Sequence, residues 1–339
     1  MDTLYTARLH GFPPNISHSS IETNISEESV LSLLIVLGSS VSLVALVFAF
    51  ITYSLFSDLR NLSGTTLLNL ISTLFMTQLL YVIGVGSVLD SQLCIALASA
   101  LHYIRLSVLC WMLLMAHNLF SQYKTGLYLN PVTDTHIKRN FIRYSIFGWG
   151  FPAVTLSMTI LIQYHDKGGR LLDTEDLKGQ NCWFLSDHAL IYGLVIPSCL
   201  LICATLYYLL RSAIFSRYVV SMQPDKRIRD KMQRKGTLQL ILFTKITLVL
   251  FISLVLATLS KLFKSEGIWI SFHVVQGLQG ILIAMLVTCN CQVLKLYMRS
   301  LKSKATLHVP SYVGQGKSSG LSKSTSLQLL TWDPPPDLV

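Results

Sequence analysis

The feature that most constrains this chain is a series of seven apolar runs, each long enough to cross a lipid bilayer. A bilayer core of about 30 Å needs about 20 helical residues, and a helix satisfies its own backbone hydrogen bonds in lipid. We therefore predict an all-α membrane protein whose seven transmembrane helices form a bundle over residues 30–292. The predicted spans are roughly residues 30–54, 66–88, 94–120, 141–163, 188–211, 237–262 and 268–292.

The composition agrees with a membrane protein and argues against a nucleic-acid-binding one. Hydrophobic residues make up 52% of the 339 residues and charged residues 13%, whereas soluble domains carry about 25% charged residues. The net charge of +10 would suit nucleic acid, but the basic residues lie between the apolar runs rather than on one soluble face. We interpret them as topology signals, and expect membrane lipid but no nucleic acid as a partner.

The charges of the loops predict the orientation of the chain. The loops after the third and fifth runs are rich in Lys and Arg, whereas the loop after the fourth run is acid-rich. Because Lys and Arg mark the cytoplasmic side, we predict a multi-pass plasma-membrane protein with its N-terminus outside and its C-terminus inside. Residues 1–29 then form a short extracellular tail, whose N-x-S sequons at Asn15 and Asn24 are either glycosylated or chance matches.

The chain after the last run divides into two predicted parts. Residues 293–305 combine an apolar face with scattered Lys and Arg, which is typical of an interfacial amphipathic helix. Residues 306–339 are rich in Ser, Gly, Lys and Pro, and we expect a disordered cytoplasmic tail. Its serines are compatible with arrestin recruitment, and its terminal Asp337-Leu338-Val339 with a PDZ ligand, but ordinary tail composition explains both.

Arg105 is a charge predicted to lie near the middle of the membrane. It follows Cys94 by eleven residues, which corresponds to about 16 Å along a helix. A charge at that depth costs about 2.5–3.5 kcal/mol, and no predicted span contains Asp or Glu. Three interpretations stay open: a hydrogen-bond network with Gln78, Gln276 or Gln279, contact with an anionic ligand, or a lipid-facing side chain that reaches the interface.

Cys94 and Cys182 are the two cysteines that the predicted topology places on the extracellular side. Because that side is oxidising, we expect a disulfide that ties the loop after the fourth span over the mouth of the bundle. Two free thiols are the alternative.

We expect no catalytic, cofactor or metal site, and therefore no enzyme. His102, Cys110 and His117 share one helical face, but rises of about 12 and 10 Å place them too far apart to bind one ion. No intramembrane carboxylate and no pair of nucleophile and base is apparent.

Several short motifs resemble those of the secretin and adhesion superfamily of seven-transmembrane G-protein-coupled receptors. The chain is most similar to methuselah-like receptors, and the resemblance covers about residues 30–297. The motifs are L-R-N-L-S-G at 59–64, L-H-Y at 101–103, W-M-L at 111–113, Y-S-I-F-G-W-G-F-P at 144–152, Cys182-Trp183 and L-Q-G at 278–280.

The resemblance implies roles for several residues. It supports the bridge between Cys94 and Cys182, and it places Trp111, Trp149 and Gln279 in the packed core of the bundle. It also implies a cytoplasmic cavity for a G protein, lined by the basic loop 211–235. The alternative is that the basic residues of this loop only determine the topology of the chain. The basic residues of that loop expected to meet an intracellular partner are Arg227, Arg229, Lys231, Arg234 and Lys235.

The chain departs from the family pattern at five positions. The family's histidine of the second helix and glutamate of the third align with Leu67 and Met115. The glycine and tryptophan of the sixth helix align with Phe251 and Leu254, and the asparagine before L-Q-G aligns with Gln276. A polar lock and a glycine hinge are therefore missing, and we expect activation to use a less sharply bent sixth helix.

These observations lead to one leading hypothesis and two alternatives. The leading one is a cell-surface receptor that transmits an extracellular signal to a heterotrimeric G protein, with an unknown extracellular ligand. The missing lock and hinge motivate the first alternative, a non-signalling scaffold or decoy derived from such a receptor. The 29 residues before the first run, which are too few for a large ectodomain, motivate it as well. The second alternative is a transporter whose anion path is lined by Arg105, Gln78 and Gln276.

Overall fold

The computed structural model describes residues 21–56, 61–86, 91–124, 134–166, 191–221, 226–263 and 266–289, together with Val293 and Met298. In this part of the chain, seven helices are long and apolar enough to cross a membrane, which confirms the predicted seven-helix bundle. The helices are α2 (Ile21–Leu55), α3 (Leu62–Gly86), α4 (Ser91–Lys124), α5 (Asp134–Asp166), α8 (Ile196–Ser221), α9 (Lys226–Phe263) and α10 (Glu266–Thr288), and a π-helical turn, η2 (Ile191–Val195), precedes α8.

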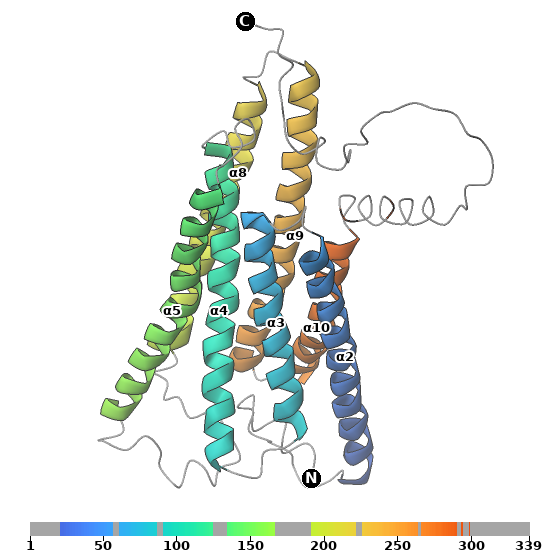
Figure 1. Cartoon of the computed structure of the whole chain (residues 1–339). Helices are drawn as coiled ribbons and strands as arrows, with labels where there is room; N and C mark the ends of the chain where they lie inside the picture. Colours follow the sequence, from blue (N-terminus) through green and yellow to red (C-terminus); the bar gives the residue numbers. More distant parts are fainter. Residues whose placement is uncertain are drawn as a thin grey trace, which may run out of the picture.

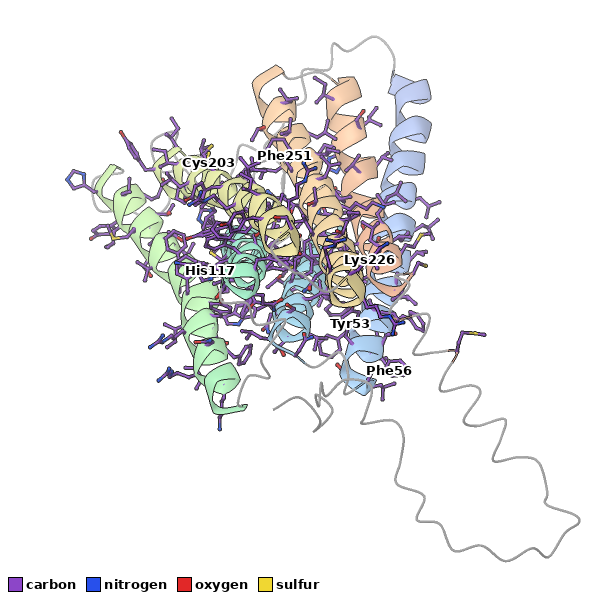
Figure 2. The ribbon with its side chains drawn as sticks, turned by 90° about the horizontal axis from the view of Figure 1, so that it is seen from above. Tyr53, Phe56, His117, Cys203, Lys226 and Phe251 are labelled. Atoms are coloured by element: carbon purple, nitrogen blue, oxygen red, sulfur yellow. The ribbon has the colours of Figure 1, made fainter. Side chains whose placement is uncertain are left out.

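The helices run alternately up and down, so that α2, α4, α8 and α10 begin at the same end of the bundle (Figure 1). We call this end, where α2 begins, the predicted extracellular end, and the opposite end the predicted cytoplasmic end. Helix α4 has the largest share of buried residues among the seven spans and α5 the smallest. In the view along the bundle, α5 lies at its edge beside α4 (Figure 2).

The outer surface of the bundle suits lipid. Large apolar side chains such as Val44 on α2, Ile146 on α5 and Leu200 on α8 are more than half exposed. Among described residues of the seven spans, charged side chains are few, and Lys138 and Lys124 stand at span ends. An apolar surface of this extent is stable only in a hydrocarbon environment, as expected for a multi-pass membrane protein.

Local sequence signals explain several helix boundaries. The Asn61 side-chain oxygen accepts a hydrogen bond from the backbone N–H of Gly64 at 2.8 Å, which makes Asn61 the N-cap of α3. Helix α5 tolerates Pro152 in its interior, and the neighbouring Thr155 hydroxyl donates to the carbonyls of Phe151 and Pro152. These two bonds attach the Thr155 side chain to the turn that contains the proline.

Two segments that were predicted to lie outside the membrane are partly helical in the structure. Helix α8 continues to Ser221 and α9 begins at Lys226, so most of the basic segment 211–235 lies within these helices rather than in an irregular loop. Helix α2 likewise begins at Ile21, inside the predicted tail. The reason is physical: hydropathy marks where a helix leaves the membrane, whereas the helix itself continues into water wherever the sequence allows.

Helices α2 and α10 pack closely against each other at Gly277 and Gly280 of α10. The Ser42 hydroxyl donates to the carbonyl of Gly277 and accepts from the N–H of Ile281. A Cβ atom on Gly280 would lie 2.7 Å from Ser42 Cβ and 3.0 Å from Leu46 Cδ1. The two helices therefore pack through small residues, as is common where no hydrophobic force drives helices together.

Gly280→Ala is expected to destabilise the bundle by about 1–3 kcal/mol, because its methyl group overpacks the contact with Ser42. The measurement is the thermal unfolding of purified protein. Gly267→Ala in the first turn of α10 is the matched control, since nothing lies within 4 Å of its added Cβ. Equal stability of the two variants would contradict the close approach.

Candidate functional site

A polar cluster joins α3, α9 and α10 in the half of the bundle nearer the predicted extracellular end. The Tyr81 hydroxyl forms a hydrogen bond with His273 Nδ1. Gln78 Nε2 donates to the carbonyl of Gln276 at 2.6 Å, and the Ser253 hydroxyl donates to Gln276 Oε1 at 3.1 Å. All five side chains are buried. We call this group, Gln78, Tyr81, Ser253, His273 and Gln276, the His273 cluster.

Arg105 lies beside this cluster on α4. Its charge acts on Tyr81, His102 and His273, and these three side chains are almost fully buried. This favours the two interpretations that direct the guanidinium group toward the bundle interior. Among described residues no hydrogen bond or ion pair to Arg105 is present, so the hydrogen-bond network with Gln78, Gln276 or Gln279 stays a prediction.

His102 lies one turn before Arg105 and is 1% exposed. Its ring nitrogens have no hydrogen-bond partner within ordinary geometry, although the backbone of Gly193 in η2 lies beside the ring. Gln279 on α10 is also buried, and its Oε1 atom has no partner. Gln78 Oε1 is also buried without a hydrogen-bond partner. This half of the interior therefore contains several polar atoms with unused hydrogen-bonding capacity.

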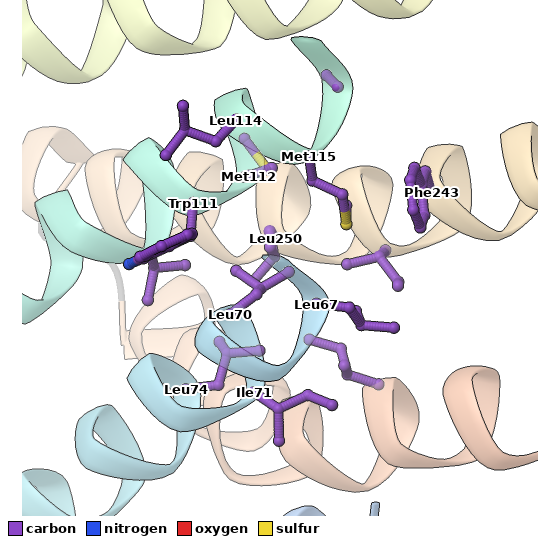
Figure 3. Close-up of a cluster of buried hydrophobic side chains, with 14 of the residues drawn as sticks. Leu67, Leu70, Ile71, Leu74, Trp111, Met112, Leu114, Met115, Phe243 and Leu250 are labelled. Atoms are coloured by element: carbon purple, nitrogen blue, oxygen red, sulfur yellow. The ribbon is translucent and has the colours of Figure 1, made fainter. Parts of the chain in front are cut away.

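Figure 3 shows an apolar layer, which lies nearer the predicted cytoplasmic end than the His273 cluster does. Its labelled side chains come from α3, α4 and α9 and pack against one another across the bundle axis. Leu67 and Met115, where the family pattern has a polar pair, belong to this layer and are 2% and 1% exposed. The departure predicted from the sequence therefore has a structural counterpart: the polar lock is replaced by apolar packing.

Trp111 anchors the layer on the side of α5. Its ring is 0% exposed and lies edge-on to the ring of Trp149, with 5.8 Å between ring centroids. A Cβ atom on Gly148 would lie 2.7 Å from Trp111 Cε2, so the indole rests directly on the α5 backbone. The Tyr103 hydroxyl donates to the carbonyl of Trp149 at 3.1 Å, which fixes the same pair of helices from above.

A second polar group closes the predicted cytoplasmic end. Three amide side chains converge on the hydroxyl of Ser63 in α3: Asn118 Nδ2 at 2.9 Å, Gln122 Nε2 at 2.8 Å and Gln239 Nε2 at 3.0 Å. Asn118 and Gln122 belong to α4 and Gln239 to α9. We call these four residues the Ser63 junction.

The position of the Ser63 junction was not predicted from the sequence. Ser63 precedes Leu67 by one helical turn and Asn118 follows Met115 by one turn, so polar contacts between α3 and α4 lie one turn nearer the cytoplasmic end than in the family pattern. The sequence shows only that Asn and Gln residues occur inside the apolar runs. It does not show that their side chains share one hydrogen-bond partner, because this depends on how the helices pack.

The residues expected to meet a G protein lie in the first turns of α9. Arg227 is exposed and Arg229 is partly buried, while Lys231, Arg234 and Lys235 follow within the same helix. Nearby, Gly236 packs against the Tyr123 ring, because a Cβ atom there would lie 2.6 Å from Tyr123 Oη. The basic segment thus begins the helix that the Ser63 junction attaches to α4.

Phe251, at the position of the family's hinge glycine, points away from the bundle axis. Its side chain is 39% exposed. Leu254 packs against the core. Helix α9 runs without interruption from Lys226 to Phe263.

Several predicted sites lie outside the described residues. These are Cys182, Asn15 and the chain after Met298. Cys94 and Asn24 lie in helices α4 and α2, but their side chains are not among those described. The disulfide, the glycosylation and the tail interactions therefore stay predictions.

Comparisons with known proteins agree with this architecture. The family described as "7 transmembrane receptor (Secretin family)" matches residues 28–283. The human "Adhesion G protein-coupled receptor E3" is 32% identical over 186 residues, which are 54% of this chain and 26% of that protein. The mouse "Adhesion G-protein coupled receptor G4" is 28% identical over 225 residues, 65% of this chain and 7% of that protein.

A zebrafish relative, "Adhesion G protein-coupled receptor L4" of Danio rerio, is 27% identical over 189 residues, which are 56% of this chain and 24% of that protein. The match thus covers about a quarter or less of the length of these relatives. The matched region of this chain contains the His273 cluster, the apolar layer and the Ser63 junction.

Proposed function

Because the chain belongs to the secretin family of seven-transmembrane receptors, we propose that it transmits an extracellular signal to a heterotrimeric G protein. It is a multi-pass protein of the plasma membrane. The proposal concerns the finer steps: an extracellular ligand shifts the arrangement of the helices, and the cytoplasmic end then binds the G protein. A ligand shifts such an equilibrium only by its difference in affinity for the two arrangements.

The Ser63 junction is the observation that carries this proposal. It connects α9 to α3 and α4 through one hydroxyl. A hydroxyl has two acceptor lone pairs and one proton, so the three amides share a limited capacity. A small displacement of α9 would release Gln239 while Asn118 and Gln122 keep the remaining bonds. Such an arrangement suits a contact that is made in one state and broken in another.

The basic start of α9 suits the proposed partner. Arg227 is exposed at the predicted cytoplasmic end, and further Lys and Arg follow along the same helix. We propose that Arg227, Arg229, Lys231, Arg234 and Lys235 contribute to the surface that meets the G protein. Arrestin and PDZ binding by the tail, the Cys94–Cys182 disulfide and glycosylation at Asn15 and Asn24 belong to the same proposal.

The apolar layer disfavours a transport path along the bundle axis. An anion that entered at Arg105 would meet Leu67, Leu70, Met115 and Leu250, all of which are buried. Dry apolar packing of this kind presents no polar group to replace the hydration of an ion. We therefore do not propose a transporter.

Ser63→Ala is expected to raise basal guanine-nucleotide exchange on the coupled Gα roughly fivefold. The substitution removes the shared partner of three amides, and one hydrogen bond between α9 and the other helices contributes about 1 kcal/mol. The measurement is nucleotide exchange on a panel of Gα proteins by receptor reconstituted in lipid, at equal receptor concentration.

Ser72→Ala is the matched control for this experiment. Ser72 is on the same helix, but its hydroxyl donates to the carbonyl of Leu68 in the preceding turn and joins no other helix. Its exchange rate should equal that of the wild type. If neither wild type nor Ser63→Ala drives exchange on any Gα although both are folded at the cell surface, the scaffold alternative replaces the receptor proposal.

A further inference from the structure

Arg211 of α8 is an exposed arginine inside a membrane-spanning segment. The span that contains α8 runs from Ile191 to Tyr218, and Arg211 precedes its end by seven residues, which corresponds to about 10 Å along the helix. The Arg211 side chain is exposed, and those of its neighbours Leu210 and Ile214 are more than half exposed. Arg211 therefore faces lipid in the half of the bundle nearer the predicted cytoplasmic end.

Two aromatic rings fix the position of the Arg211 guanidinium group. Its central carbon, Cζ, lies 5.8 Å from the centroid of the Tyr207 ring and 5.7 Å from that of the Phe215 ring, one helical turn away on either side. Phe215 is held in turn by an edge contact with Phe120 of α4, with 5.5 Å between ring centroids. The face of an aromatic ring attracts a cation at such distances. The guanidinium group is thus held along the helix surface at a position set by the fold.

The hydrogen-bonding capacity of Arg211 is available to a partner outside the chain. An arginine side chain stays charged and carries five N–H donors in one plane. Among the described residues, none accepts a hydrogen bond from Arg211 or forms an ion pair with it. At this depth the remaining acceptors are the oxygens of lipid headgroups and of water near them. A phosphate group matches the planar fork of the guanidinium group with two parallel hydrogen bonds.

A second exposed arginine, Arg143, lies at a similar depth on α5. His117 of α4 joins the two helices: its Nδ1 atom lies 2.9 Å from Tyr144 Oη of α5, and its ring is edge-on to that of Tyr208 in α8 at 5.1 Å between centroids. Arg143 directly precedes Tyr144, and Arg211 follows Tyr208 by three residues, about 4.5 Å along the helix. Because α5 and α8 run in opposite directions (Figure 1), both arginines lie on the cytoplasmic side of this contact.

The charge of this surface is positive. Arg143, Arg211 and Arg217 are exposed. Helix α8 contains no Asp or Glu, and α5 contains acidic residues only at its two ends, Asp134 and Asp166. A phospholipid with a net negative charge is attracted by such a surface, whereas the cationic group of a zwitterionic headgroup is repelled by it.

We propose that Arg211, supported by Tyr207 and Phe215, binds the headgroup phosphate of an anionic phospholipid in the leaflet at the predicted cytoplasmic end. The acyl chains extend toward the middle of the membrane along the exposed side chains of Tyr207, Cys203 and Leu200, which follow one another on the same face of α8. The lipid reaches Arg211 directly from the surrounding bilayer, so the site needs no opening into the bundle interior.

The test measures lipid binding without any G protein, so its outcome does not depend on the proposed signalling. Purified receptor is reconstituted in nanodiscs that contain phosphatidylserine and phosphatidylcholine with equal acyl chains in equal amounts. Native mass spectrometry of the released receptor gives the ratio of the two lipids that stay bound. In a separate arm, excess glycerophosphoserine, which is the same headgroup without acyl chains, distinguishes a lipid site from a site for free anions.

The wild type should retain several-fold more phosphatidylserine than phosphatidylcholine. Arg211→Gln should reduce this enrichment about fivefold, the factor that one basic residue contributes near an anionic membrane surface. Arg211→Lys keeps the charge but not the planar fork and should fall between the two. Tyr207→Leu should reduce the enrichment about twofold, because it removes one of the rings that hold the guanidinium group.

Lys245→Gln is the matched control. Lys245 is an exposed cation inside the α9 span, but Ile241 and Val249, one turn away on either side, carry no aromatic ring. This variant should enrich phosphatidylserine as the wild type does. In phosphatidylcholine alone, all of these variants should keep the wild-type unfolding midpoint, because the substituted side chains are exposed.

An equal loss of enrichment in Lys245→Gln and Arg211→Gln would indicate general attraction between the basic protein and the membrane, and would overturn the proposal. It is likewise overturned if the wild type shows no preference for phosphatidylserine, if Arg211→Gln keeps that preference, or if glycerophosphoserine abolishes it. A lower unfolding midpoint of Arg211→Gln in phosphatidylcholine alone would assign the arginine to the support of the fold and would overturn the proposal as well.

Discussion

Met115→Glu is expected to lower the free energy of unfolding by about 3 kcal/mol or more. Met115 is 1% exposed and lies among the apolar side chains of this layer (Figure 3). A buried carboxylate without a partner costs several kcal/mol, and protonation reduces this cost only to that of an unsatisfied polar group. The measurement is thermal or denaturant unfolding of the purified protein.

Met115→Leu is the control for volume and should cost less than about 1.5 kcal/mol. The double variant Leu67→His with Met115→Glu restores the pair of residue types found in the family pattern. It should be more stable than the sum of the two single substitutions predicts, by about 1 kcal/mol or more, because the new side chains bond to each other. Wild-type stability of Met115→Glu would mean that water reaches this layer.

Trp111→Ala is expected to lower the free energy of unfolding by about 3–5 kcal/mol, at least as much as Met115→Glu does. The indole is fully buried and packs on both Gly148 and Trp149, so its removal leaves a cavity where α4 meets α5. The expected consequence in cells is a strong loss of surface expression, and in purified protein a lower unfolding midpoint.

A double-mutant cycle tests the contact itself. Gly148→Ala should destabilise the wild type, because its methyl group would lie 2.7 Å from Trp111 Cε2. In the Trp111→Ala background the same substitution should be nearly neutral, since the clashing ring is gone. Gly150→Ala on the same helix is the control, because nothing lies within 4 Å of its added Cβ. Additive effects of Gly148→Ala and Trp111→Ala would contradict the packing described here.

The number and type of helices were predictable because membrane crossing has a strong signature. A span needs a long apolar run, and each of the seven runs contains few charges. The ends of the helices were not predictable in this way. The α9 helix begins with a charged segment at Lys226, and charged residues in water are compatible with either helix or loop.

The candidate site was predictable in part. The depth of Arg105 and the lack of acidic residues followed from spacing and composition alone. The identity of its neighbours did not, because Tyr81 and His273 come from distant runs whose rotation about their axes is set by packing. The Ser63 junction was missed for the same reason: the sequence shows four polar residues, and only the fold brings them to one hydroxyl.

The pairing of α2 with α10 has a consequence for how the protein is made. The first span of the bundle packs against the last, so the Ser42 hydroxyl, which is 0% exposed and bonds to Gly277 and Ile281, remains without these partners until α10 has been made. Contacts between such distant segments form late and leave earlier intermediates open to misassembly. A chain that stops before Gly277 would leave the Ser42 hydroxyl on α2 without its partners, a feature by which membrane quality control could recognise an unfinished receptor.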